Sequence, residues 1–289
     1  MPDAMVLPLL IAALLALAVA MWHRRVPPVV AARTTTAVLV LVAAVAVPTV
    51  WLAGLSFLTH APVIGRWLDA CVDSLGAHHQ VAPWIGVPAV ALAAVGTWRA
   101  VGVVRTYRGL RHTDGGVHVV DHPEAFAFTT PGRHGRIIVS STLDAHLTAQ
   151  ELAVVLAHER AHARHRHDLY LLAAQISAAL LMPLHPLVNR LRYSIERWAD
   201  EDAVVECGDR RLVARTLGRV ALIGAAPQPA LAFAGLGVPA RMAALMAPPV
   251  RRSGRMHRLA LVLLIGLTAV FAAVQMRHLV DMVLAFCFG

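Results

Sequence analysis

Two histidines and a glutamate are spaced for metal-assisted hydrolysis in the segment His158-Glu159-Arg160-Ala161-His162. On a helix, residues four apart lie on the same face, so both imidazoles can bind one Zn²⁺ ion. Glu159 directly follows the first histidine and would lie beside the metal, where it can accept the proton of a bound water. The segment therefore predicts one catalytic zinc ion, with His158 and His162 as ligands and Glu159 as the general base.

The residues around this segment predict a buried helix. Thr148 and Glu151 fit a capping box, in which each side chain accepts a hydrogen bond from a free backbone N–H. The five residues 152–156 are all apolar, which indicates burial on every side, and a metal would satisfy polar groups in such a place. No glycine follows, so the helix is expected to continue and to carry His165 and Asp168 too far along its axis to reach the same ion. A chance match in a histidine-rich chain is the alternative.

A catalytic zinc ion usually takes three protein ligands and a water, so a third ligand is needed. A second helix, expected from Tyr193, places Glu196 and Asp200 on one face, with Ala199 and Ala203 beside them to allow a close helix–helix approach. The glutamate arm is longer, so Glu196 is the predicted third ligand. Asp200 would then hold a ligand imidazole through its second N–H. A solvated acidic face is the alternative for these carboxylates.

Metal-assisted hydrolysis of an acyl group also needs a donor that stabilises the oxyanion. Arg241 is a candidate for that role. An ordinary surface arginine is the preferred alternative, because many arginines in this chain can be explained by membrane topology.

The composition points to a membrane protein. Of the 289 residues, 58% are hydrophobic and the mean hydropathy is +0.63, which is too apolar for an ordinary soluble domain. The net charge is +9, every basic residue other than histidine is arginine, and the arginines lie mostly beside apolar runs. Membrane orientation explains this charge better than nucleic acid, for which the sequence contains no binding motif. The three cysteines form no C-x-x-C pair, so no zinc ribbon or redox motif is indicated.

Four apolar segments are long enough to cross a bilayer, which requires about 20 residues. They are predicted at residues 4–22, 36–57, 83–104 and 259–276. Arginines cluster after the first and third of these, so the positive-inside rule puts residues 105–258 in the cytoplasm and both termini outside. The apolar segment 169–188 is broken by prolines and is predicted to lie in the membrane interface or on the catalytic domain.

The predicted fold class is a mainly α membrane protein with a cytoplasmic zincin-like α+β catalytic domain. Strand candidates at 117–120, 125–128 and 136–140 predict a small antiparallel sheet, whose edge could hold an extended peptide. The chain is thus divided into three transmembrane helices over residues 1–104, the catalytic domain over 105–258, and a fourth transmembrane helix with a short outer tail over 259–289.

Three elements of the sequence together resemble the gluzincin membrane peptidases, which include the HtpX-like and CAAX-prenyl endopeptidases and the BlaR/MecR antibiotic-sensor peptidases. These elements are H-E-R-A-H at 158–162, His167 five residues further on, and E-R-W-A-D at 196–200. Ala125-Phe126-Ala127 is similar to the end of the family's N-A-F-A edge strand, with Glu124 in place of the asparagine. The resemblance implies that His158, His162 and Glu196 are the zinc ligands. It also implies that Glu159 is the general base and that Asp200 orients a ligand imidazole.

The arrangement of three spans before the catalytic domain and one after it resembles BlaR/MecR peptidases in particular. In those proteins the protease cuts a cytoplasmic repressor, or itself, when an outer penicillin-binding domain senses the drug. This chain ends shortly after its fourth predicted span and has no S-x-x-K motif. We therefore expect no sensor domain and no β-lactam sensing.

The predicted function is hydrolysis of peptide bonds in a protein or peptide substrate by an integral zinc metalloendopeptidase of the plasma membrane. A cytoplasmic transcriptional repressor is one candidate substrate, the lipid bilayer is a partner, and direct nucleic acid binding is not expected. The alternative is a non-catalytic metal-binding membrane scaffold or signalling receptor. A transporter with a chance motif is less favoured, because the predicted membrane segments at 4–22 and 259–274 carry almost no polar residues.

Overall fold

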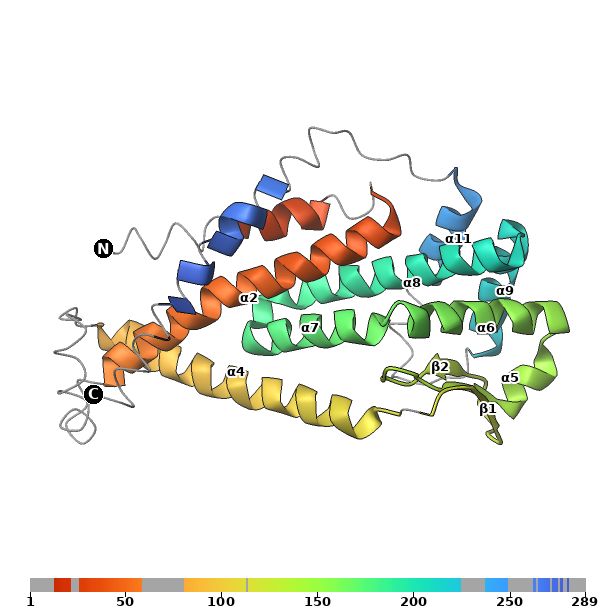
Figure 1. Cartoon of the computed structure of the whole chain (residues 1–289), viewed down its shortest axis with the longest axis horizontal. Coiled ribbons are helices and arrows are strands. Elements are labelled where there is room, and N and C mark those ends of the chain that lie inside the picture. Colours follow the sequence, from red (N-terminus) through yellow and green to blue (C-terminus); the bar gives the residue numbers. More distant parts are fainter. Residues whose placement is uncertain are drawn as a thin grey trace.

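The computed structural model describes residues 13–21, 26–58, 81–112, 114–224 and 237–248, together with scattered helical residues between 262 and 280. The predicted spans at 4–22 and 259–276 are only partly inside these ranges, and the predicted outer tail lies outside them. Long helices make up one end of the molecule, and a group of shorter helices with a small sheet makes up the other (Figure 1).

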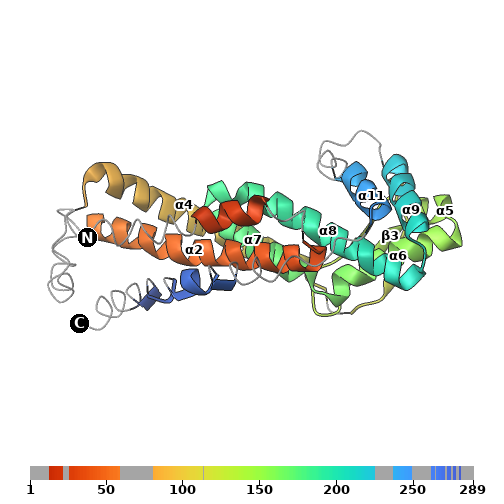
Figure 2. The ribbon, with the colours of Figure 1, turned by 90° about the horizontal axis from the view of Figure 1, so that it is seen from above.

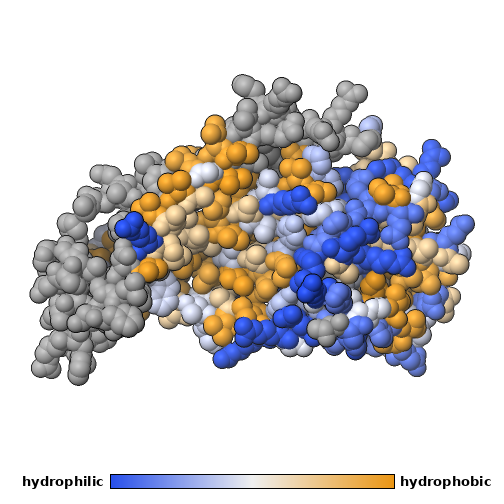
Figure 3. All heavy atoms as spheres, in the orientation of Figure 1, coloured by the Kyte–Doolittle hydropathy of each residue, from blue (hydrophilic) through white to orange (hydrophobic). Residues whose placement is uncertain are grey.

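Within the ranges that the structure describes, two helices are long and apolar enough to cross a membrane by length and composition: α2 (Pro28–Leu58) and α4 (Pro83–Leu110). They contain the predicted spans at 36–57 and 83–104, and they pack against each other. Helix α2 is half buried, whereas α4 exposes many large apolar side chains. On the face shown in Figure 3, hydrophobic atoms gather over α2, and hydrophilic atoms are most frequent toward the end with α6 and α9, where smaller apolar patches also show.

The segment predicted as one interfacial helix over 169–188 is two helices. Helix α7 (His167–Leu180) ends before a 3₁₀ turn at Met182–Leu184, and α8 (His185–Cys207) then runs back. The prolines explain the difference, because Pro183 lies in the 3₁₀ turn and Pro186 lies in the first turn of α8, where proline is tolerated. The expected start of the second helix at Tyr193 is therefore eight residues late.

The hairpin of α7 and α8 packs on α2, and α7 also packs on α4 (Figures 1 and 2). At one end of α7 the Tyr107 hydroxyl donates a hydrogen bond of 2.7 Å to Asp168. At its other end, a Cβ added to Gly96 would lie 3.1 Å from the carbonyl oxygen of Leu180, so a glycine allows this close contact. Helix α7 thus runs antiparallel to α4 and lies beside it only between Tyr107 and Gly96, a residue near the middle of α4. The chain then reverses direction into α8.

The helix that carries the histidine motif, α6 (Ala149–Arg164), ends earlier than expected. Its start has the predicted capping box between Thr148 and Glu151. At its end Arg166 has a φ of 52°, the only positive φ of a non-glycine residue in the described part of the chain. The expectation that the helix continues because no glycine follows is wrong, because an arginine takes the left-handed conformation here. This turn starts α7 at His167.

The sheet is mixed and not antiparallel as predicted. It contains β1 (Val117–Val120), β2 (Ala127–Thr129) and β3 (Ile137–Ser140) in the order β1-β3-β2. Strand β3 pairs in parallel with β1 and antiparallel with β2. Apolar alternation identified the strands but carries no information on pairing direction. Strand β3 is the most apolar and buried of the three, so the central position suits it.

The remaining elements complete the core around α6. Helix α5 (Ser141–His146) follows β3, and α9 (Arg210–Ile223) and α11 (Val238–Met246) follow α8. Ala157, Ala199 and Ala203 are fully buried where α6 and α8 pack together. Their small size allows two helices to approach closely.

The capping box makes a testable contribution to the stability of α6. Replacing Thr148 by alanine should lower the free energy of unfolding by about 1 kcal/mol, because the N–H of Glu151 loses its acceptor at the helix start. Thr148→Ser keeps the hydroxyl and is the matched control. Thermal unfolding of the purified variants measures the difference. Equal melting temperatures for the alanine and serine variants would contradict this assignment.

Candidate metal centre

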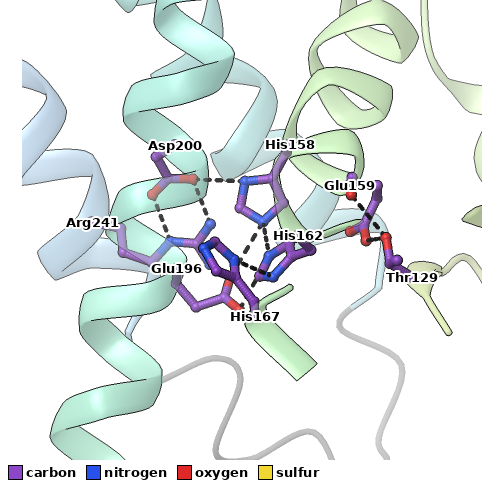
Figure 4. A network of polar contacts seen from close by, with 8 residues as sticks. All are labelled: Thr129, His158, Glu159, His162, His167, Glu196, Asp200 and Arg241. Carbon is purple, nitrogen blue, oxygen red and sulfur yellow. Dashed lines mark hydrogen bonds and ion pairs between the residues drawn. The ribbon is translucent and has the colours of Figure 1, made fainter. Parts of the chain in front are cut away.

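Three potential ligand atoms converge between α6 and α8 (Figure 4). Nε2 of His158 lies 3.1 Å from Nε2 of His162 and 3.4 Å from Oε2 of Glu196. Nε2 of His162 lies 3.7 Å from Oε1 of Glu196. Three ligands bound to one tetrahedral Zn²⁺ would be roughly 3.4 Å from one another, given bond lengths of about 2.1 Å. The donor set and its spacing therefore fit a zinc ion.

The metal-facing orientation of both imidazoles is set by contacts to their second nitrogens. Nδ1 of His158 lies 3.1 Å from Oδ1 of Asp200, which is buried. Nδ1 of His162 lies 3.0 Å from Nδ1 of His167, which is also buried. If each ligand ring carries its proton on Nδ1, Asp200 and His167 accept these protons and leave both Nε2 lone pairs for a metal.

His167 was linked to the site only by the family resemblance, and the left-handed turn at Arg166 explains its position. Burial is the main reason that the pKa of His167 is lowered to about 3, and the nearby His162 and His165 lower it further. The ring is therefore neutral and can accept the Nδ1 proton of His162. Its own Nε2 has no hydrogen-bond partner among the described residues.

Arg241 lies at this site and is not an ordinary surface arginine. It is 9% exposed and reaches in from α11. Its Nε and Nη2 donate to the two carboxylate oxygens of Asp200 at 2.8 and 2.6 Å, and Nη1 lies 2.8 Å from Oε2 of Glu196. All three guanidinium nitrogens are thus directed at carboxylates, so the structure places Arg241 as a clamp on Asp200 and Glu196.

The charges of the site favour a divalent cation. Burial alone would raise the pKa of both Glu196 and Asp200, but contacts with His158 and Arg241 outweigh it and hold both pKa values below the usual range. With neutral imidazoles, the carboxylates of Glu159, Glu196 and Asp200 face the single positive charge of Arg241. Two negative charges remain, which a divalent ion would neutralise.

Without a metal, a proton on His158 can supply part of that neutralisation. Burial lowers the pKa of His158, but its hydrogen bonds with Asp200 and Glu196 raise it to about 10 overall. A metal ion must displace this proton when it binds.

Glu159 lies beside the three ligands and contacts the sheet. The hydroxyl of Thr129, at the end of β2, lies 2.8 Å from Oε2 of Glu159 and 2.9 Å from its backbone oxygen. Sequence reasoning missed Thr129, because nothing in the local pattern distinguishes it from another strand residue. A cavity of about 600 Å³ opens here, and β2, the end of α4, α6 and α7 line it.

His165 and Asp168 lie away from the ligand atoms. His165 pairs with Asp202 at 2.6 Å. Asp168 was expected on the same helix as the motif but belongs to α7, where it accepts hydrogen bonds from Tyr107 and from the backbone N–H of Gly132. Asp168 thus joins α4, α7 and the turn between β2 and β3, and so supports one wall of the cavity.

The family model for Peptidase family M48 matches residues 109–193. This range contains the sheet and the whole of α6 with His158, Glu159 and His162, and it ends three residues before Glu196. The match supports an M48 family zinc metallopeptidase. The match covers less than half of the chain. It does not test the resemblance to BlaR/MecR peptidases, which stays a prediction. No curated protein and no solved structure matches this chain.

Zinc binding by single variants tests the separate roles of the carboxylates on α8. Glu196→Gln should lower zinc occupancy sharply, because a neutral amide replaces a ligand. Asp200→Asn should weaken zinc binding by roughly 10–100-fold, because it removes the acceptor for the Nδ1 proton of His158. Glu206→Gln is the control, since Glu206 lies on the same helix but pairs with the surface residue Arg160. Metal analysis after dialysis gives the result. Full zinc in the Glu196 variant together with loss in the Asp200 variant would reverse the two roles.

Proposed function

We propose that this protein is an integral membrane zinc metalloendopeptidase that hydrolyses peptide bonds of a protein substrate at the cytoplasmic side of the membrane. The observation that carries the proposal is the meeting of His158, His162 and Glu196 beside Glu159 in one open cavity. The match to Peptidase family M48 supports the same chemistry.

A zinc ion at this site would lower the pKa of a bound water and polarise the scissile carbonyl. Glu159 would accept a proton from the attacking water and pass it to the leaving amine. Thr129 would hold one oxygen of Glu159 by its hydroxyl and leave the other for proton transfer. Asp200 and His167 would keep the two ligand imidazoles in place through the whole reaction.

The substrate would bind as an extended peptide along β2. This strand is at an edge of the sheet, and Ala127, Phe128 and Thr129 line the cavity. An edge strand offers unpaired backbone groups to a peptide by strand addition. This arrangement would place the scissile bond beside Glu159. A cytoplasmic repressor is one candidate for such a substrate.

The proposed topology places residues 105–258 on the cytoplasmic side, between the third and fourth predicted spans. The α7–α8 hairpin supports this, because α7 follows α4 only from Tyr107 to about Gly96 and α8 then returns. If a hairpin turns back halfway along a membrane-spanning helix, the chain returns to the side of the membrane from which it entered.

Reporter fusions test this topology. Fusions at Gly115 and Gly208 should both report the cytoplasm, because the hairpin between them does not cross the bilayer. A fusion within residues 59–80, between the second and third predicted spans, is the control for the outer side. Opposite sides for Gly115 and Gly208 would exclude the proposed topology.

A non-catalytic metal-binding scaffold or receptor is the rival function, and Glu159 distinguishes the two. A scaffold needs the ligands but no general base. A protease needs both, and the contact between Glu159 and Thr129 keeps the base at a defined distance from the sheet edge.

Replacing the general base should separate metal binding from catalysis. Glu159→Gln should keep zinc bound and lower peptide cleavage by at least about 100-fold, the lower end of the usual contribution of general acid–base catalysis. Glu206→Gln should cleave like the unmodified protein. Cleavage of an unfolded model protein and metal content, both measured on purified variants, give the answer. Undiminished cleavage by Glu159→Gln would remove Glu159 from the mechanism.

A further inference from the structure

A second cavity, of about 420 Å³, lies next to the metal cavity along α7, between α4 and the beginning of α8, and the two cavities share Val103 and Gln175. One face of each of three helices lines it. Helix α4 contributes Trp98, Arg99, Gly102, Val103 and Arg105; α7 contributes Gln175, Ala178 and Ala179; and α8 contributes His185, Val188, Asn189 and Arg192. The apolar and small residues form the wall, and the long polar side chains surround it.

Among the described residues, the lining of this cavity is cationic and includes no carboxylate. Arg99, Arg105 and Arg192 line it together with His185, and none of the lining residues is an aspartate or a glutamate. Within the described part of the chain, none of the three arginines makes a hydrogen bond or an ion pair. Most arginines around the metal centre and on α6, α8 and α9 do have such partners. Three unpaired guanidinium groups around one cavity favour an anionic ligand, and their planar donors suit phosphate oxygens.

The position of the cavity on α4 indicates where the ligand comes from. Arg99 lies inside the apolar helix α4, within the span predicted at 83–104, where an arginine usually marks a functional site. Trp98 is 77% exposed, and tryptophan is enriched at the boundary between membrane and water. Beyond it, exposed apolar side chains continue along α4 at Leu92 and Val95. A ligand with a phosphate head and apolar chains would match both parts of this surface.

We propose that this cavity binds the phosphate headgroup of an anionic membrane phospholipid, with the acyl chains lying along the exposed apolar face of α4. Arg99, Arg105 and Arg192 hold the phosphate, and Gln175 and Asn189 provide further hydrogen bonds. Basic pockets between membrane helices on the cytoplasmic side bind anionic headgroups in this way. A soluble phosphate ester offers the same charge but has no apolar part to contact α4.

Calorimetric titration of the purified full-length chain in a neutral detergent distinguishes the two sources of phosphate. The probes are dioctanoylphosphatidylglycerol, dioctanoylphosphatidylcholine and glycerol phosphate. We expect the phosphatidylglycerol to bind about tenfold more tightly than the zwitterionic phosphatidylcholine, given the usual contribution of a few arginines to anionic-lipid binding. We expect no measurable binding of glycerol phosphate. Equal affinities for the two lipids would overturn the proposal, and so would glycerol phosphate binding as tightly as the phosphatidylglycerol.

Variants locate the binding within the cavity. Arg99→Gln combined with Arg192→Gln should weaken phosphatidylglycerol binding by about tenfold or more. Arg108→Gln should change it by less than about twofold, because Arg108 lies on α4 but does not line the cavity, and only general attraction is lost. Arg192→Gln alone changes one exposed side chain and replaces the double variant if thermal unfolding shows that the double variant is not folded. An equal loss for Arg108→Gln and the cavity variants would show general surface attraction and exclude a specific site.

Discussion

The metal centre depends on the close packing of α6 against α8. Its ligands come from both helices, and their atoms lie 3.1–3.7 Å apart, so a small change in the distance between the helices would separate Glu196 from the histidines. Ala157 on α6 and Ala199 and Ala203 on α8 are fully buried at this contact. Larger side chains there would push the helices apart, because packed cores have little free volume to accept them. The small size of these three side chains thus allows the helix separation that the ligand distances require.

Close packing brings carboxylates into a buried place, and their charges must be neutralised. Burying an unpaired carboxylate costs free energy, because the charge loses its hydration. Arg241 offsets part of this free energy by contacting both Asp200 and Glu196. The site nevertheless keeps more negative than positive charge when its imidazoles are neutral. A cation at this place reduces the excess negative charge of the buried cluster. That cation is either a proton on His158 or a divalent metal.

The sequence predicted features that depend on local spacing and missed those that depend on tertiary contacts. Helix periodicity placed His158 and His162 on one face, and the capping box marked the start of α6. The turn at Arg166 has no signal in the sequence, because the left-handed backbone conformation is expected at glycine and not at arginine. The pairing direction of β1 and β3 is set by chain connection and packing, which alternation does not encode. The clamp role of Arg241 has no local signal, since its partners lie on another helix.

Helix α7 connects the metal centre to the apolar helix α4. Its N-terminal residue His167 contacts the ligand His162, and Gln175 and the facing Val103 of α4 line both the metal cavity and the cationic cavity. The two cavities therefore share one wall, and any shift of α7 along α4 would alter both. The hydrogen bond between Tyr107 and Asp168 and the close contact at Gly96 oppose such a shift at the two ends of α7. A phosphate group held between Arg99 on α4 and Arg192 on α8, as proposed, would oppose this shift as well. Such binding would keep His167, and with it the contact to Nδ1 of His162, in one position relative to α4.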